Sequence, residues 1–175
     1  MTRFRFPSFK EHPAKAEARQ VLAAVTATAR EPSLYGPGRV PDTFDGRFQM
    51  LALCGVLALR RLAAAPGHRQ LTQAFTDALF LNFDDGLREA GVGDLSVPKH
   101  MKKIGQAFYG RYAAYDSPLS GDDQGALAAA LSRNIWGEEH APFAPALAQH
   151  AAGVARRLAA APPGGIAAPE LWAPG

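Results

Sequence analysis

The stretch VPKHMKKIGQAFYGRYAAY, residues 97–115, repeats apolar side chains at intervals of three and four residues. This spacing places them on one face of an α-helix, because the helix turns once every 3.6 residues. The apolar face comprises Val97, Met101, Ile104, Phe108, Tyr112 and Tyr115. The lysines of the same stretch fall on other faces. The pattern therefore predicts an amphipathic helix packed against a core.

The rest of the chain predicts five further helices. Alternating runs of β-branched residues are absent, and alanine, which favours helix, is abundant. Segments rich in proline and glycine separate the helical stretches, and Pro118 is expected to end the helix described above. The expected helices cover about residues 13–30, 43–65, 68–90, 97–115, 122–136 and 142–161. We predict an all-α fold, a single-domain irregular bundle of about six helices.

The length of 175 residues suits one domain with a core of its own. We expect a basic N-terminal arm at residues 1–12, a helical domain at residues 13–161 and a Pro/Gly-rich tail at residues 162–175. The tail is expected to be mobile. Cys54 lies within an apolar run, so we expect it to be a buried thiol without a disulfide partner.

The formal net charge of +3 arises mainly from the first twenty residues. No apolar run approaches the roughly 20 residues that span a bilayer, and no secretory signal is visible. We therefore expect a cytoplasmic location, with a peripheral place at the inner membrane left open. The basic arm also carries Phe4, Phe6 and Phe9. It suits either contact with an anionic membrane or RNA surface, or a solvated tail that packs on the body.

Patterns typical of catalysis are missing, so we expect no enzymatic activity, no metal and no cofactor. The chain has no glycine-rich phosphate loop, dinucleotide fingerprint or zinc-ligand spacing. The acidic residues Asp84, Asp85, Glu89 and Asp94 are the best candidates for acid–base work. However, Asp85 and Glu89 lie four residues apart with Arg88 beside them. That arrangement is typical of an exposed, salt-bridged helix end.

Several ordered motifs resemble those of a known family. They are DDGLREAGVGDLSVPKHMKKIGQAFYGR at residues 84–111, FDGRF at 44–48, AYD at 114–116 and SRNI at 132–135. Together they are similar to the ubiquinol–cytochrome c reductase (bc1 complex) assembly chaperone family over about residues 42–136. Phe83 stands where methionine is usual, and Pro98 where glycine is usual. The composition, rich in Ala, Gly and Arg, suits a bacterial member.

The resemblance implies an all-helical, non-catalytic chaperone without a cofactor. Such a protein binds newly made cytochrome b, or another nascent membrane subunit of the same complex, and assists biogenesis of the respiratory cytochrome bc1 complex. Mitochondrial relatives act with a partner protein near the ribosome, so the ribosome surface near the exit tunnel is a further candidate partner. Transient contact with a membrane surface is another, and DNA is not expected. The alternative is a peripheral membrane or lipid-binding helical protein without catalytic activity.

The junction between the third and fourth expected helices is the predicted site. Gly91 and Gly93 permit backbone angles closed to other residues, and Asp94 is expected to pair with Arg88 across the turn. Lysines project beside this turn, and Tyr and Arg side chains are favoured anchors in interfaces. The predicted partner-binding residues are Arg88, Lys99, Lys102, Lys103, Tyr109 and Arg111.

Two glycines interrupt the fourth expected helix. Gly105 and Gly110 each cost about 1 kcal/mol of helix stability relative to alanine. We therefore expect something to pack closely against them, either another helix of this chain or a bound client segment.

Overall fold

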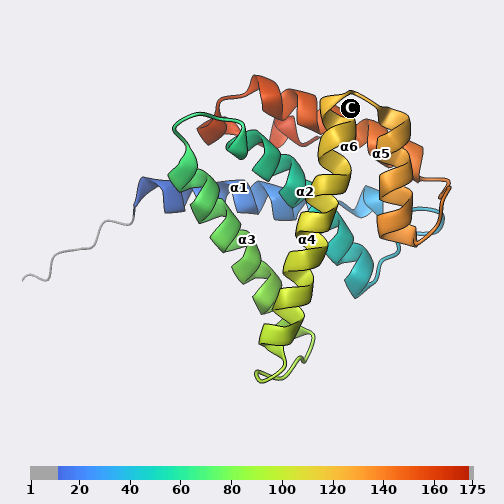
Figure 1. Cartoon of the computed structure of the whole chain (residues 1–175), viewed down its shortest axis with the longest axis horizontal. Coiled ribbons are helices and arrows are strands. Elements are labelled where there is room, and N and C mark those ends of the chain that lie inside the picture. Colours follow the sequence, from blue (N-terminus) through green and yellow to red (C-terminus); the bar gives the residue numbers. More distant parts are fainter. Residues whose placement is uncertain (1–11, 174–175) are drawn as a thin grey trace, which may run out of the picture.

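The helix α2, Phe44–Ala63, forms the centre of the fold. Residues 52–59 of this helix are all buried, which requires neighbours on every side. The structure, a computed structural model, describes residues 12–173. The helices that pack directly on α2 are α1 (Pro13–Ala29), α3 (Arg69–Glu89), α4 (Val97–Ser120) and α6 (Ala144–Ala160) (Figure 1).

The predicted all-α bundle is confirmed. Within residues 12–173 there are six α-helices and no strand, apart from one isolated bridge between Tyr35 and Val40. The remaining helix, α5 (Gln124–Leu131), lies against α4 and α6. The expected basic arm falls outside the described residues except for His12. The division into a helical domain at residues 13–161 and flanking segments stays a prediction.

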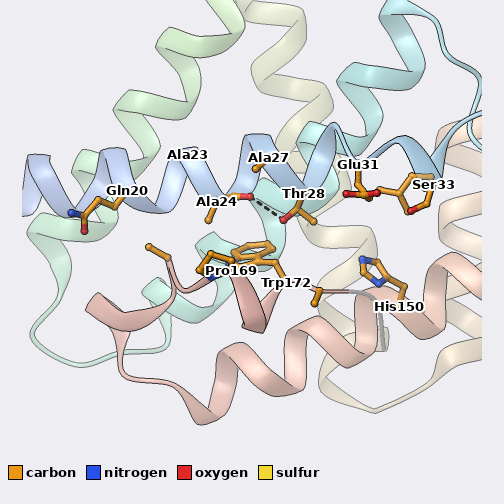
Figure 2. A pocket seen from close by; sticks show the side chains of 13 residues that line it. Gln20, Ala23, Ala24, Ala27, Thr28, Glu31, Ser33, His150, Pro169 and Trp172 are labelled. Carbon is orange, nitrogen blue, oxygen red and sulfur yellow. Dashed lines mark hydrogen bonds between the residues drawn. The ribbon is translucent and has the colours of Figure 1, made fainter.

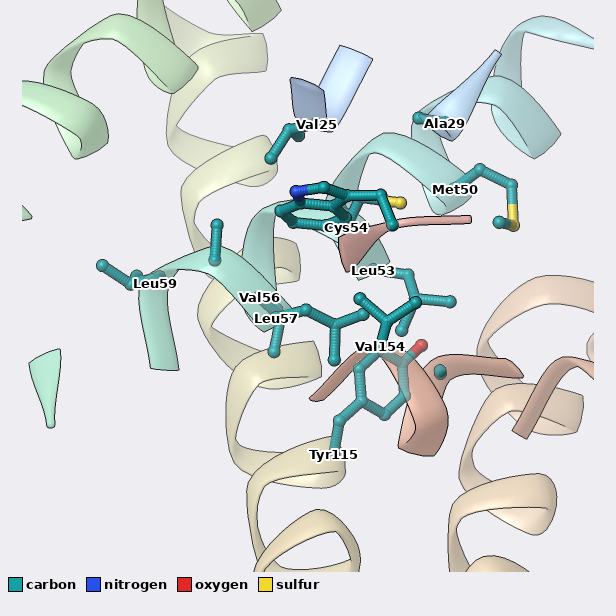
Figure 3. Packing of buried hydrophobic residues seen from close by; sticks show 14 of the residues in the cluster. Val25, Ala29, Met50, Leu53, Cys54, Val56, Leu57, Leu59, Tyr115 and Val154 are labelled. Carbon is teal, nitrogen blue, oxygen red and sulfur yellow. The ribbon is translucent and has the colours of Figure 1, made fainter. Parts of the chain in front are cut away.

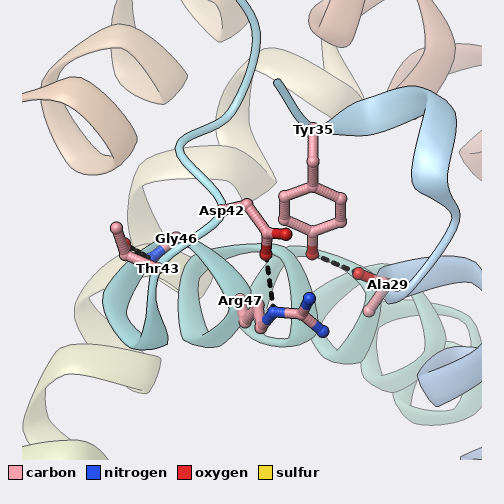
Figure 4. A network of polar contacts seen from close by, with 6 residues as sticks. All are labelled: Ala29, Tyr35, Asp42, Thr43, Gly46 and Arg47. Atoms are coloured by element: carbon pink, nitrogen blue, oxygen red, sulfur yellow. Dashed lines mark hydrogen bonds and ion pairs between the residues drawn. The ribbon is translucent and has the colours of Figure 1, made fainter. Parts of the chain in front are cut away.

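The start of α2 is fixed by a side-chain cap and a close backbone approach. The Thr43 hydroxyl accepts a hydrogen bond from the Gly46 amide at 3.1 Å (Figure 4). A Cβ atom on Gly46 would lie 2.0 Å from the carbonyl oxygen of Pro41, so only glycine fits. The FDGRF motif thus holds the preceding loop against the first turn of α2.

The fourth helix is longer than expected, and the prediction that Pro118 ends it is wrong. α4 continues to Ser120, because a proline near a helix end removes only one backbone donor. The last turn is also tied to α2. Arg60 donates to the Asp116 carboxylate at 2.6 Å and to the Ser120 hydroxyl at 2.8 Å.

The SRNI motif forms a π-helical turn, η2 (Ser132–Trp136), directly after α5. The buried Ser132 hydroxyl accepts a hydrogen bond from the Ala141 amide at 2.7 Å. Gly137 then reverses the chain with a φ of 71°, in the region that favours glycine. The motif therefore shapes the connection between α5 and α6.

The C-terminal segment packs on the body, whereas the sequence predicted a mobile tail. Ile166 and Trp172 are buried and join the hydrophobic core. The Trp172 indole N–H donates to the Ile166 carbonyl at 2.7 Å, and Arg157 of α6 donates to the Leu171 carbonyl at 2.9 Å. Burial of the two apolar side chains outweighs the disordering tendency of the surrounding prolines and glycines.

The core contains two buried groups of interest (Figure 3). Cys54 is buried as expected, and burial raises the pKa of its thiol to about 12. Tyr115 is fully buried, and burial raises its pKa as well. Within the described chain, its hydroxyl has no hydrogen-bond partner. This isolated hydroxyl is a source of instability, since burying an unsatisfied polar group is costly.

Two Tyr→Phe substitutions should therefore have opposite effects. Tyr115→Phe removes the isolated hydroxyl and should leave the free energy of unfolding unchanged or raise it by about 1 kcal/mol. Tyr35→Phe removes a hydrogen bond to the Ala29 carbonyl and should lower it by about 1 kcal/mol. Urea unfolding measures both. A loss of stability in Tyr115→Phe equal to that in Tyr35→Phe would contradict this account.

Candidate partner-binding site

The turn between α3 and α4 is held by Arg88 and one glycine. The Arg88 guanidinium lies 2.7 Å from the Asp84 carboxylate and also pairs with Asp94. Gly91 has a φ of +83°, whereas Gly93 does not adopt a positive φ. Arg88 is thus engaged inside the turn, which leaves it less suited to contact a partner than the sequence suggested.

Three lysines project from the outer face of α4. Lys99, Lys102 and Lys103 are exposed, and none makes an ion pair with the described part of the chain. Tyr109, two turns further along, is 53% exposed and stacks on Phe80 of α3, with ring centroids 6.0 Å apart. The structure therefore brings these lysines and Tyr109 onto the same hairpin. We call Lys99, Lys102 and Lys103 the lysine face.

Arg111, the last of the predicted partner-binding residues, faces α2. Its Nε donates to the Gln49 side chain of α2 at 2.6 Å, and its guanidinium lies over the Phe48 ring at 5.5 Å. Such a cation–π contact contributes on the order of 1 kcal/mol. Arg111 thus holds α4 against α2 and is not part of the lysine face.

A row of aromatic rings crosses the hairpin from its outer face to α2. Tyr109 contacts Phe80, Phe80 contacts Phe108 at 5.6 Å between centroids, and Phe108 contacts Phe83 at 6.1 Å. Phe83 in turn contacts Phe48 at 5.2 Å. Such pairs add about 0.5–1.5 kcal/mol each beyond area burial. The row packs α2, α3 and α4 against one another at their junction.

A groove of about 580 Å³ opens where this row ends at α2. It lies between the end of α1, the start of α2 and the end of α3. Its apolar lining comprises Phe44, Phe48, Leu51, Phe83 and Ile104. Phe44 is 58% exposed, although it begins a helix that is otherwise largely buried. The groove was not predicted from the sequence, because its lining residues come from four helices and no single stretch indicates them.

The α3 rim of the groove is acidic. Asp85 and Glu89 line it, and neither makes an ion pair among the described residues. The salt-bridged helix end that the sequence predicted is present, and Arg88 forms it with Asp84 and, as expected, with Asp94, but not with Asp85 or Glu89.

The opposite rim carries Arg30 and Arg47. Arg47 is held by Asp42 at 2.7 Å and lies 5.6 Å from the centre of the Tyr35 ring (Figure 4). The Tyr35 hydroxyl donates to the Ala29 carbonyl, and burial raises its pKa to about 12. This network fixes the loop that forms the second wall of the groove.

A second cavity, of about 680 Å³, lies between α1 and the C-terminal segment (Figure 2). Alanines of α1 and the Trp172 ring line much of it, and His150 of α6 stands at one end. Burial lowers the pKa of His150, and the charge of Arg157 lowers it further. Both effects favour the neutral form of the His150 imidazole.

This shift predicts a pH dependence of stability. A depressed pKa in the folded state means that protonation favours unfolding, so stability is full above the unfolded pKa of about 6.5 and falls as the pH drops below it. His150→Gln should flatten this part of the curve of unfolding free energy against pH. His68→Gln, at the start of α3, is the control. An unchanged slope in His150→Gln would refute the prediction.

The described residues lack the groupings that catalysis on a metal requires. No three His, Cys, Asp or Glu side chains in residues 12–173 lie close enough together to hold a metal ion. No helix in the same part of the chain is both long and apolar enough to cross a membrane. The distinctive surface features of residues 12–173 are a cationic helix face and an apolar groove with charged rims. These define a helical protein whose surfaces suit the binding of other macromolecules.

The chain belongs to the ubiquinol–cytochrome c chaperone family, whose model matches residues 38–170. This confirms the family indicated by the motifs, and the match extends beyond them on both sides. In three dimensions the chain is similar to the crystal structure of the Cbp3 homologue from Brucella abortus, with 38% sequence identity and a TM-score of 0.78. The similarity covers 90% of this chain and 88% of that chain. No curated protein matches the sequence.

Proposed function

We propose that this protein is a non-catalytic chaperone that binds newly made cytochrome b and assists assembly of the respiratory bc1 complex. The observation that carries the proposal is the 38% identity to the Cbp3 homologue over 90% of the chain, together with the family match. Both the fold and the positions of the motifs agree with this role. A protein that acts by binding needs no catalytic cluster.

The groove supplies the surface that such a client requires. An unassembled membrane protein exposes apolar side chains to water, which costs about 25 cal/mol for each Å². Phe44, Phe48 and Leu51 offer an apolar lining that is open to solvent at one side. Apolar grooves of this kind accept helices through side chains one turn apart.

The lysine face supports a second contact. We propose that Lys99, Lys102 and Lys103, together with Tyr109, meet an anionic surface, namely ribosomal RNA near the exit tunnel. Each lysine is exposed, and each neutralised phosphate releases a counterion, which favours binding at low salt. This contact would place the chaperone where its client emerges.

Reversing the charge of the lysine face tests this contact. The triple variant Lys99→Glu, Lys102→Glu, Lys103→Glu should reduce recovery of the protein with translating ribosomes by about tenfold, because attraction to phosphate becomes repulsion. Sedimentation of ribosomes from cell extracts measures the recovery. The matched control reverses three exposed cations elsewhere, in the variant Lys15→Glu, Arg69→Glu, Arg133→Glu.

Equal losses in the two triple variants would show a general effect of charge and would contradict specific binding by the lysine face.

The proposed role in bc1 assembly is tested by deleting the gene. The amount of assembled bc1 complex should fall and return when the wild-type chain is supplied. Normal levels of the complex in the deletion strain would exclude the proposed function.

The alternative of membrane binding draws support from Leu95. This leucine is fully exposed at the tip of the α3–α4 hairpin, which projects from the body in Figure 1. An exposed leucine next to lysines suits the headgroup region of an anionic bilayer. Flotation with vesicles of anionic lipid tests it. Leu95→Ser should lower recovery with the vesicles, and equal recovery would exclude insertion of the tip.

A further inference from the structure

We propose that the groove between α1, α2 and α3 recognises the end of an apolar helix that carries lysine or arginine on the side facing α3. This inference rests on the proposed function and names the chemistry of the client. In membrane proteins, Lys and Arg accumulate at the cytoplasmic ends of membrane-spanning helices. The groove thus has the chemistry to select that end of a newly made membrane segment.

The first support is the apolar lining. Phe44 lines the groove and exposes more than half of its surface, and the Phe48 and Phe83 rings of the same lining pack together with centroids 5.2 Å apart. The Arg111 guanidinium, held by Gln49, lies against the Phe48 ring and fixes its position. This part of the lining is therefore formed before anything binds. A preformed groove loses little conformational freedom on binding.

The second support is the uneven charge of the two rims. Asp85 and Glu89 lie one turn apart on α3, and no cation among residues 12–173 forms an ion pair with either carboxylate. On the opposite rim, Arg47 is already paired with Asp42, and Arg30 adds a further positive charge. An occupant with positive charge on every side would therefore be repelled by the rim that carries Arg30 and Arg47. Its positive charge must face α3.

The third support is Gly86. This glycine lies in α3 between the two acidic residues and lines the groove. Apart from its chain neighbours and the backbone of its own helix, a Cβ atom placed on it would meet no described atom within 4 Å. Glycine weakens a helix relative to alanine, so the fold alone gives no reason for it. Small residues let a second helix approach closely, so the close approach of a bound helix would explain a glycine at this position.

The experiment uses two synthetic helical peptides of about 16 residues, built from leucine, alanine and glutamine. One ends in three lysines and the other in three glutamates. Fluorescence anisotropy with the purified full-length chain should show binding of the lysine peptide, and binding of the glutamate peptide should be weaker by about tenfold or more.

The charge of the rim is tested by Asp85→Lys, Glu89→Lys, which should abolish or invert this preference. The matched control, Glu138→Lys, Glu139→Lys, reverses two exposed acids outside the groove and should bind like the wild type. Equal affinity of the wild type for both peptides, or equal losses in the two double variants, would overturn the inference.

The space at Gly86 is tested by Gly86→Ala, with Gly110→Ala as its control. Gly110 is an exposed helical glycine with the same open surroundings and lies outside the groove. The helix of this chain that the sequence analysis offered as a close neighbour of Gly110 is not found among the described residues. Both variants should raise Tm by about 1–4 °C, because alanine favours helix. Only Gly86→Ala should also weaken binding of the lysine peptide. Unchanged binding in Gly86→Ala would contradict a close approach at this wall.

Other occupants of the groove give distinct results. The wild-type chain could sediment as a dimer that the double variant Asp85→Lys, Glu89→Lys converts to a monomer. That result would assign the groove to a second copy of this chain and overturn the inference.

Different results would contradict the proposed function. Discrimination between the peptides with normal bc1 levels in the deletion strain would exclude the proposed function alone. Loss of the complex without any discrimination would exclude this inference alone.

Discussion

Complete burial of α2 is the constraint on which the rest of the structure depends. Because residues 52–59 contact neighbours on every side, the helix cannot rotate or slide without exposing apolar surface. Its first turn is locked further by the cap at Thr43 and by the close approach of Gly46 to the preceding loop. These restraints hold Phe44 at the surface. The groove is therefore a consequence of how the core is packed, and its lining needs no rearrangement to form.

The α3–α4 hairpin joins this core to two separate surfaces. The aromatic row runs from Tyr109, which is exposed on α4, to Phe48, which lines the groove, and none of the three lysines of the lysine face lines the groove. Arg88 is drawn into the turn by Asp84 and Asp94, which leaves the acidic rim of the groove open. Since the two surfaces share no residue, an anionic surface and a client segment could be bound at the same time.

Much of the fold could be predicted from the sequence, and the reasons for the exceptions are physical. The helical stripe of residues 97–115 and the proline- and glycine-rich breaks gave the number of helices, because periodicity and backbone restrictions are local properties. The end of α4 could not be predicted, since Arg60, distant in sequence, holds the turn beyond Pro118. The buried Trp172 depended on a tertiary contact in the same way. At the site, the sequence indicated the lysine face but not the groove, because the lining of the groove comes from four helices and no single stretch reveals it.

The most direct test of the account is site-specific photo-crosslinking in cells that are synthesising cytochrome b. A photoreactive phenylalanine replaces Phe44 at the mouth of the groove, Lys102 on the lysine face or Ala159, an exposed residue of α6. The account predicts a covalent adduct with nascent cytochrome b from position 44, an adduct with a ribosomal component from position 102, and neither from position 159. Cytochrome b captured from position 159 but not from position 44 would contradict it.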